Sequence, residues 1–276
     1  MLDSITQSDW DFPVEMQPLF NADGIQAEKA MAVTRTDTNE ILGVHSPRYQ
    51  IVEHGDIIDQ TMDAIIGANI SKDYKAKFEV FENGAKLRGE VLFPDLVVEP
   101  AIGDYTAFRI EFFSSYDGSW AYSNIAQALR LWCLNGCTTG DTFSSTKRKH
   151  TKNIQIDADS AKIKAGVEDF MGLESKWKEW MSLSVNTDWV ENFFARTLAK
   201  TFTYTSKPKR NETQLEKLMA TYHEESSKLG KNKWALYNTM TAWATHTEAL
   251  ASPAASRRRR QEQVANAMKT ESFILI

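Results

Sequence analysis

The sequence has little of what marks secreted or membrane-spanning proteins. Only two of its 276 residues are cysteines, Cys133 and Cys137, which is too few for a disulfide framework. No apolar run approaches the roughly 18 residues that cross a membrane. The first residues are acidic where a signal peptide is basic. We therefore expect a cytoplasmic protein without a membrane partner.

The patterns of common catalytic sites are also missing. The sequence has no phosphate-binding loop, dinucleotide-binding glycine motif, His-Glu-x-x-His motif or Ser-His-Asp order. Glu53 and His54, with Asp56 and Asp59, could form an acid–base cluster. Polar residues at the start of an amphipathic helix are more often caps and solvated surface. We expect no enzymatic activity and no cofactor.

The two cysteines do not predict a metal centre. They stand four residues apart, which on a helix places both sulfur atoms on one side. A structural zinc site needs four ligands, and the five histidines are scattered, with His150 the nearest. Ordinary buried cysteines explain the pair better than a metal site or a redox site.

Residues 74–93 predict a β-hairpin around Asn83-Gly84, a pair that suits a tight turn because both positions tolerate positive φ. Pairing outward from this turn places Val80 opposite Leu87 on an apolar face. The other face joins opposite charges, Glu79 with Arg88 and Lys77 with Glu90, and leaves Lys75 and Lys86 as free cations.

Residues 104–125 repeat this design around Asp117-Gly118. The period then changes to that of a helix, because Asn124 and Gln127 resemble a capping box. Asn135-Gly136 resembles a helix stop. The second hairpin is therefore expected to lead directly into a short helix.

The fold class that follows is α+β, with an antiparallel sheet of two consecutive hairpins packed on helices and a mostly helical C-terminal half. A helix is expected over residues 55–67, and Asn186, Asn211 and Asn232 stand where N-caps are needed. The expected segments are an irregular N-terminal arm (1–28), an α+β core domain (29–152), a helical region (153–250) and a basic C-terminal tail (251–276).

The balance of charge limits the possible partners. Lys and Arg number 32 against 37 Asp and Glu, which gives a net charge of −5. Such a chain has no general attraction for polyanions, so a contact with nucleic acid must come from a local basic patch.

One basic patch follows the second hairpin. Four formal positive charges fall within residues 147–152, and neighbouring hydroxyl groups at 144–146 can also bind phosphate oxygens. A solvated loop is the alternative. The candidate nucleic-acid-binding residues here are Lys147, Arg148, Lys149, His150 and Lys152. A second run, Arg257 to Arg260, is either a further basic patch or a solvated tail.

Aromatic residues of the second hairpin offer a second kind of contact. Trp120 and Tyr122, with Phe113, could stack unpaired bases as aromatic side chains do in proteins that bind single strands. Aromatic residues of a sheet more often belong to the core. Only an exposed ring beside the basic patch would favour stacking.

Several segments occur in an order that resembles a known family. These are "SPRYQIVEHGDII", "SYDGSWAY", "ALRLWCLNGC", "KRKHT" and "KWALYNTMTAWATHTE". Together they resemble the phage/plasmid-like family called domain of unknown function 932, over roughly residues 30 to 250. The resemblance implies an origin in phages, prophages and plasmids, commonly among replication and recombination genes, and no established activity.

The expected order of elements is also similar to the core of the Rad-type single-strand annealing proteins. Members of that group form rings that hold DNA in a basic groove, and they need no cofactor. By this resemblance Arg130 and the segment Lys147 to Lys152 would lie near the DNA backbone.

The leading hypothesis is a non-enzymatic protein of a phage or plasmid that binds single-stranded DNA and promotes annealing or recombination as a homo-oligomer. The alternative is a protein-binding accessory or anti-defence factor of a mobile element that inhibits a host system. An acidic surface outside the basic patch and little affinity for DNA would favour the alternative.

Overall fold

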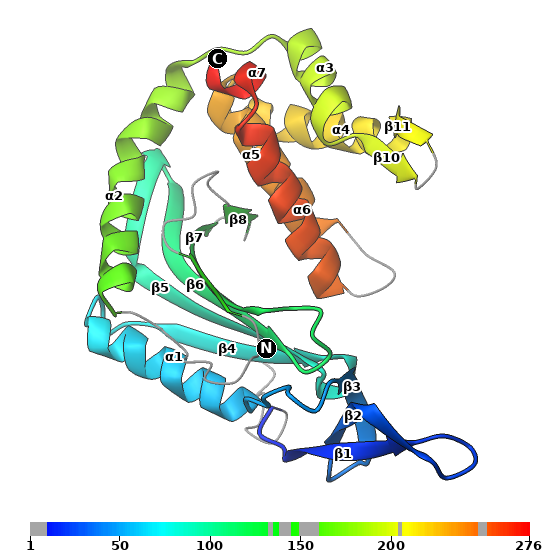
Figure 1. Cartoon of the computed structure of the whole chain (residues 1–276). Coiled ribbons are helices and arrows are strands. Elements are labelled where there is room, and N and C mark those ends of the chain that lie inside the picture. The colour runs from blue at the N-terminus through cyan, green and yellow to red at the C-terminus, as the bar shows by residue number, and fades with distance from the viewer. Residues whose placement is uncertain (1–9, 132–134, 138–144, 149–159, 204–205, 248–252) are drawn as a thin grey trace. The chain divides into compact units, whose positions relative to one another are not determined.

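A computed structural model describes residues 10–131, 135–137, 145–148, 160–203, 206–247 and 253–276 (Figure 1). The chain divides into two compact units. Unit 1 comprises 1–95, 109–126 and 143–167, and unit 2 comprises 96–108, 127–142 and 168–276. These units interleave along the chain, whereas consecutive segments were expected. The described helices include none long and apolar enough to cross a membrane.

Unit 1 begins with a three-stranded antiparallel sheet in the order β1-β2-β3. Its strands are β1 (Val14–Phe20), β2 (Gln26–Arg35) and β3 (Glu40–His45), and a turn with Asn39 at φ 60° joins the last two. The expectation of an irregular arm is therefore wrong over β1. Scattered apolar residues there pack on Val33, Leu42 and Tyr116, a distant contact that local patterns do not reveal.

Helix α1 (His54–Ala68) confirms the helix expected over residues 55–67. Its buried face carries Ile57, Ile58 and Ile65, and Asn69 ends the helix in the left-handed conformation at φ 48°. The helix lies along the sheet of unit 1, where the hydroxyl groups of Thr61 and Tyr122 are 3.3 Å apart (Figure 1).

The main sheet confirms the α+β fold. Its order is β4-β5-β6-β7-β8, with β9 also paired to β7. The strands are β4 (Lys75–Phe81), β5 (Lys86–Ala101), β6 (Asp104–Ser115), β7 (Tyr122–Arg130), β8 (Asn135–Cys137) and β9 (Ser145–Arg148). Strands β5, β6 and β7 contribute residues to both units.

The register predicted for the first hairpin is confirmed. Strands β4 and β5 pair antiparallel, with Val80 opposite Leu87 and Glu79 opposite Arg88. A short 3₁₀ helix, η2 (Glu82–Gly84), forms the turn, and its three residues all have positive φ. Glycine tolerates this conformation without steric cost, which explains Gly84 at φ 100°.

The helix expected after the second hairpin is wrong. Residues 122–130 continue the sheet as β7, and Asn135-Gly136 belongs to β8 instead of ending a helix. All residues of β7 except Ile125 are buried, so the strand shows no alternation of buried and exposed positions. A short segment buried on both faces cannot be distinguished from a buried helix by its period.

The C-terminal half is mostly helical, as expected. Its helices are α2 (Ser160–Ser182), α3 (Thr187–Thr197), α4 (Glu212–Leu229), α5 (Lys233–His246), α6 (Pro253–Met268) and α7 (Glu271–Ile274). The short strands β10 (Lys200–Thr203) and β11 (Ser206–Arg210) form a ribbon between α3 and α4. Helices α6 and α7 lie in the region 251–276, where a basic tail was expected.

Side-chain caps begin three of these helices at the asparagine residues that the sequence predicted as N-caps. The Oδ1 atoms of Asn186, Asn211 and Asn232 accept hydrogen bonds from backbone N–H groups at the starts of α3, α4 and α5. Each cap satisfies donors that have no partner inside the helix. The aromatic core of unit 2 includes Trp177 and Trp234, both fully buried, whose ring centroids are 5.0 Å apart.

Candidate nucleic-acid interface

Arg130 lies at the end of β7 and is fully buried at 0% exposure. Its Nε donates a hydrogen bond to Asp104, and its Nη1 donates to Oε2 of Glu225 at 2.8 Å. The indole Nε1 of Trp234 donates to the other oxygen of Asp104 at 2.8 Å. Burial lowers the pKa of Arg130, but the two carboxylates outweigh it and raise the pKa overall. Arg130 therefore links β6, α4 and α5 within unit 2. The expectation that Arg130 lies beside DNA is wrong, because its side chain is buried.

The two candidate stacking residues are also in the core. Tyr122 is 0% exposed, and Trp120 is 5% exposed with its ring edge on Phe113 at a centroid distance of 5.6 Å. Ser115 holds the backbone of Trp120, because its Oγ accepts from the Trp120 N–H at 2.9 Å. Neither ring presents a face to a base, so the core interpretation is the right one.

The basic patch after the second hairpin is partly a strand. Lys147 and Arg148 lie on β9, which pairs antiparallel with the first half of β7, opposite Ser123 and Tyr122 respectively. The backbone of these two residues is therefore held by the sheet of unit 1, whereas a loop was expected. The other candidates, Lys149, His150 and Lys152, lie outside the described residues.

The first hairpin offers fewer free cations than the sequence suggested. Lys86 was expected to be free but is 7% exposed, with its Nζ 2.7 Å from Glu82 and 3.3 Å from Asp117. It also lies 5.6 Å from the ring centroid of Trp120. Lys86 is therefore a buried structural residue.

The arginine on the charged face of that hairpin is buried, which the sequence did not indicate. Arg88 donates hydrogen bonds to Glu79 and Glu90, both at 2.7 Å, and to Glu111 on β6. Arg109 joins the same carboxylates, at 2.8 Å from Glu90 and 3.3 Å from Glu111. Burial lowers the pKa of Arg88, but its carboxylates raise it overall. The charges on this face are balanced by each other within unit 1.

The Glu53-His54 cluster has no catalytic arrangement. His54 is 1% exposed, its ring stacks on Tyr116 at 4.1 Å, and its Nε2 lies 2.9 Å from the carbonyl oxygen of Gly84. Asp56 and Asp59 are exposed. His54 therefore joins α1 to the hairpin turn. Among the described residues, no group of His, Cys, Asp and Glu gathers to hold a metal ion.

A second basic segment, not predicted from the sequence, runs from α3 to the start of α4. Between Glu191 and Glu212 the chain carries five Lys or Arg residues and no acidic residue. This run includes the β10–β11 ribbon, in which Lys200 pairs with Arg210 and Thr201 with Lys209. We call residues 192–211 the basic ribbon segment. The absence of acids over 20 residues was the signal that could have identified it.

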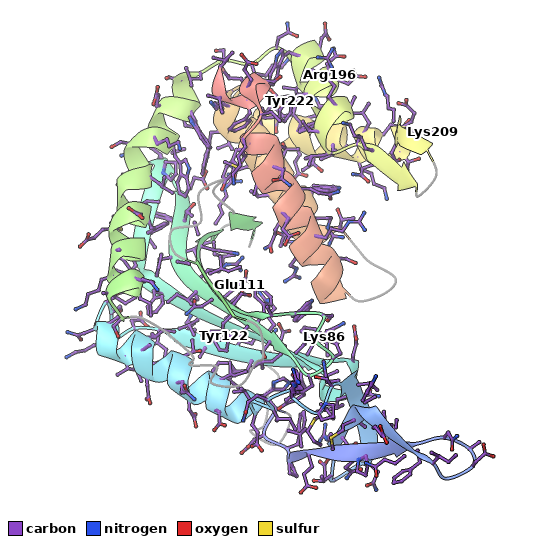
Figure 2. The ribbon with its side chains drawn as sticks, in the orientation of Figure 1. Lys86, Glu111, Tyr122, Arg196, Lys209 and Tyr222 are labelled. Atoms are coloured by element: carbon purple, nitrogen blue, oxygen red, sulfur yellow. The ribbon has the colours of Figure 1, made fainter. Side chains whose placement is uncertain are left out.

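The basic ribbon segment presents exposed cations. Arg196 on α3 and Lys209 on β11 are exposed, and Figure 2 places them on neighbouring elements of unit 2. Neither forms an ion pair with a described residue. Arg210 differs, because its guanidinium lies 3.2 Å from Glu191 and 2.8 Å from Glu212. Arg196 and Lys209 are therefore available to an external anion.

Comparison with known proteins identifies one family. A family model described as "Domain of unknown function (DUF932)" matches residues 41–272, which is most of the chain. No curated protein and no solved structure matches the chain.

Proposed function

The chain belongs to the DUF932 family, and from that premise we propose that it binds single-stranded DNA without catalysis and promotes strand annealing as a homo-oligomer. The family description assigns no activity, so the proposal depends on the charges of this chain. The observation that carries it is the basic ribbon segment, which concentrates five cations in an acidic protein.

The physical basis is neutralisation of phosphate charge. Each cation that contacts a DNA phosphate releases condensed counterions, and this release favours binding. Arg196 and Lys209 are exposed and have no competing carboxylate among the described residues. A helix end and a two-stranded ribbon hold their backbone, which reduces the entropy lost when they order on DNA.

The segment 147–152 supplies a second set of charges. Two of its four Lys and Arg residues, Lys147 and Arg148, lie on β9 and are anchored to the sheet at the backbone. This segment belongs to unit 1 and the basic ribbon segment to unit 2. These two basic segments therefore belong to different compact units.

The preference for single strands depends on the resemblance to annealing proteins, and one part of that resemblance is lost. The helix expected to carry Ala-Leu-Arg is strand β7, and Arg130 is buried in it. A comparison of single-stranded and duplex DNA is therefore a necessary part of the test.

The test is fluorescence anisotropy with a labelled single-stranded oligonucleotide, starting at about 50 mM salt. We expect binding that weakens as salt increases and that exceeds binding to duplex of the same sequence. Charge reversal by K147E, R148E and K149E together, or by R196E and K209E together, should weaken binding at least about tenfold. K178E is the matched control, because Lys178 is exposed but already pairs with Glu174.

Annealing and assembly need separate measurements. Light scattering should give a mass larger than that of one chain, and a strand-pairing assay with complementary labelled oligonucleotides should show faster annealing without nucleotide hydrolysis. Absence of binding at about 50 mM salt would overturn the proposal and favour the protein-binding alternative. Equal loss of binding in K178E would show that the effect is not local.

A further inference from the structure

Unit 2 contains a hollow that the proposed DNA contacts do not use. It has a volume of about 470 Å³ and lies between the end of α2, the start of α5 and the segments around α7. Trp180, Met268 and Phe273 are buried side chains of its wall. Volumes of about 300–1,000 Å³ with apolar walls are typical of small-molecule sites.

A buried lysine faces this hollow without an ionic partner. Lys233, the first residue of α5, is 5% exposed, and its Nζ lies 5.3 Å from the ring centroid of Trp180 and 4.7 Å from that of Phe273. It pairs with no carboxylate among the described residues. Burial and the nearby charge of Lys176 lower its pKa. Lysines are almost never buried to this extent unless they are paired.

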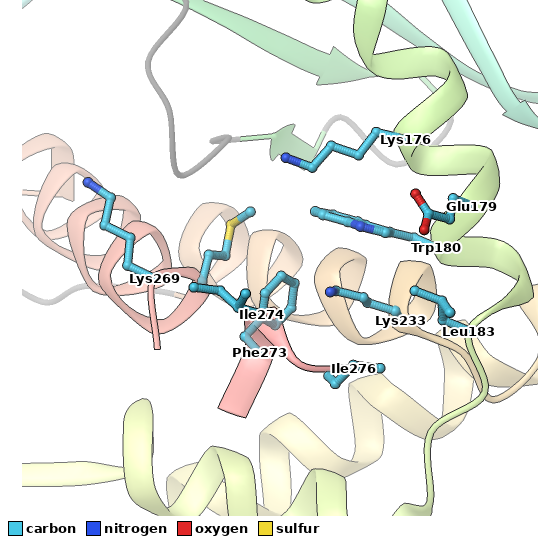
Figure 3. A pocket seen from close by; sticks show the side chains of 10 residues that line it. Lys176, Glu179, Trp180, Leu183, Lys233, Lys269, Phe273, Ile274 and Ile276 are labelled. Carbon is cyan, nitrogen blue, oxygen red and sulfur yellow. The ribbon is translucent and has the colours of Figure 1, made fainter. Parts of the chain in front are cut away.

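Further lysines make the hollow positive. The Nζ of Lys176 lies 5.6 Å from the ring centroid of Trp180, and Figure 3 shows the indole between the side chains of Lys176 and Lys233. Lys269 and Glu179 also line the hollow. The side chains of three lysines and one glutamate sum to a formal charge of +2, in a protein whose net charge is −5.

We propose that this hollow, the lysine–tryptophan pocket, binds a nucleoside phosphate. The two ammonium groups lie on opposite sides of the Trp180 indole, so the two phosphates of a nucleoside diphosphate would each take one of them. The base would lie against the apolar wall that includes Met268 and Phe273. A diphosphate carries negative charge on each phosphoryl group, so it can satisfy both Lys176 and Lys233. A single carboxylate would neutralise only one of them. This inference does not depend on the DNA-binding proposal.

The test is isothermal titration calorimetry of the full chain with ADP, adenosine and pyrophosphate. We expect ADP to bind with a dissociation constant below about 1 mM, and adenosine and pyrophosphate to bind at least about tenfold more weakly. Absence of ADP binding would overturn the proposal. Pyrophosphate binding as tight as that of ADP would also overturn it, because the pocket would then recognise only the anion.

Variants locate the site. Lys233→Met and Lys176→Met should each weaken ADP binding at least about tenfold, because each removes one ammonium group that faces the phosphate. Lys178→Met is the control on the same helix, since Lys178 pairs with Glu174 and does not line the pocket. Because Lys176 is exposed, its variant should fold even where Lys233→Met does not. Unchanged ADP affinity in Lys176→Met would overturn the assignment.

Discussion

Arg130 shows how burial changes the meaning of a basic residue. Its guanidinium holds Asp104 and Glu225 inside unit 2, so Arg130→Met would leave both carboxylates buried without their cation. Breaking a buried ion pair in this way costs about 3–5 kcal/mol. We expect urea denaturation to show a loss of unfolding free energy of that size.

The same variant separates the two roles considered for Arg130. At a urea concentration where the variant remains folded, its affinity for single-stranded DNA should equal that of the parent chain. Reduced affinity with unchanged stability would restore Arg130 as a DNA contact. Lys178→Met is a matched control for removing one positive charge, because Lys178 is exposed.

Glu79 makes stability depend on pH. Burial raises the pKa of its carboxyl group, but Lys77 and Arg88 outweigh that effect and lower it. A carboxyl group with a lower pKa in the folded state stabilises the fold above its unfolded pKa, and this stabilisation is lost as pH falls through the folded pKa. We expect the free energy of unfolding to decrease as pH falls below about 5, where an unfolded glutamate begins to take up its proton. Glu79→Gln should reduce this decrease, and an unchanged pH dependence would contradict the assigned role.

At the scale of elements, Gly89 sets the packing inside the first hairpin. It pairs with Phe78 across β4 and β5, and an added Cβ atom would overlap the ring of buried Phe112. Overpacking of this kind costs about 1–3 kcal/mol. Gly89→Ala should therefore destabilise the protein in thermal or urea unfolding.

Gly172 is the matched control for that substitution. It lies inside α2, and nothing lies within 4 Å of an added Cβ atom. Alanine is favoured over glycine in a helix by about 0.5–1 kcal/mol, so Gly172→Ala should stabilise the protein slightly. Equal effects at both glycines would contradict the close approach of Phe112.

The elements also show which parts of the fold the sequence could predict. The β4–β5 register followed from a local turn and alternating residues, and the three asparagine caps followed from side chains next to the backbone that they bind. Strand β1 packs on Tyr116, which is distant in sequence, and β7 is buried on both faces without alternation. Local patterns carry no information about such partners or layers.

The candidate site was harder to predict because charge in a sequence does not indicate exposure. Arg130 and Lys86 are buried and paired, whereas Arg196 and Lys209 are exposed within a run that contains no acid. Arg130 and Lys86 both meet carboxylates from other elements, such as Glu225 for Arg130. Only the three-dimensional structure brings these groups together.

At the scale of the whole molecule, an acidic protein can bind DNA only through segments that locally reverse its charge. The basic ribbon segment and the segment 147–152 belong to different compact units, so one strand that contacts both would combine their charges. For single strands the slope of log affinity against log salt changes by about 0.7 for each phosphate contact. Charge reversal in either segment should reduce the slope, and reversal in both should reduce it by the sum. Anisotropy titrations over a salt series measure this directly. If reversal in both segments reduces the slope no more than reversal in one segment, the two segments do not contact the same strand.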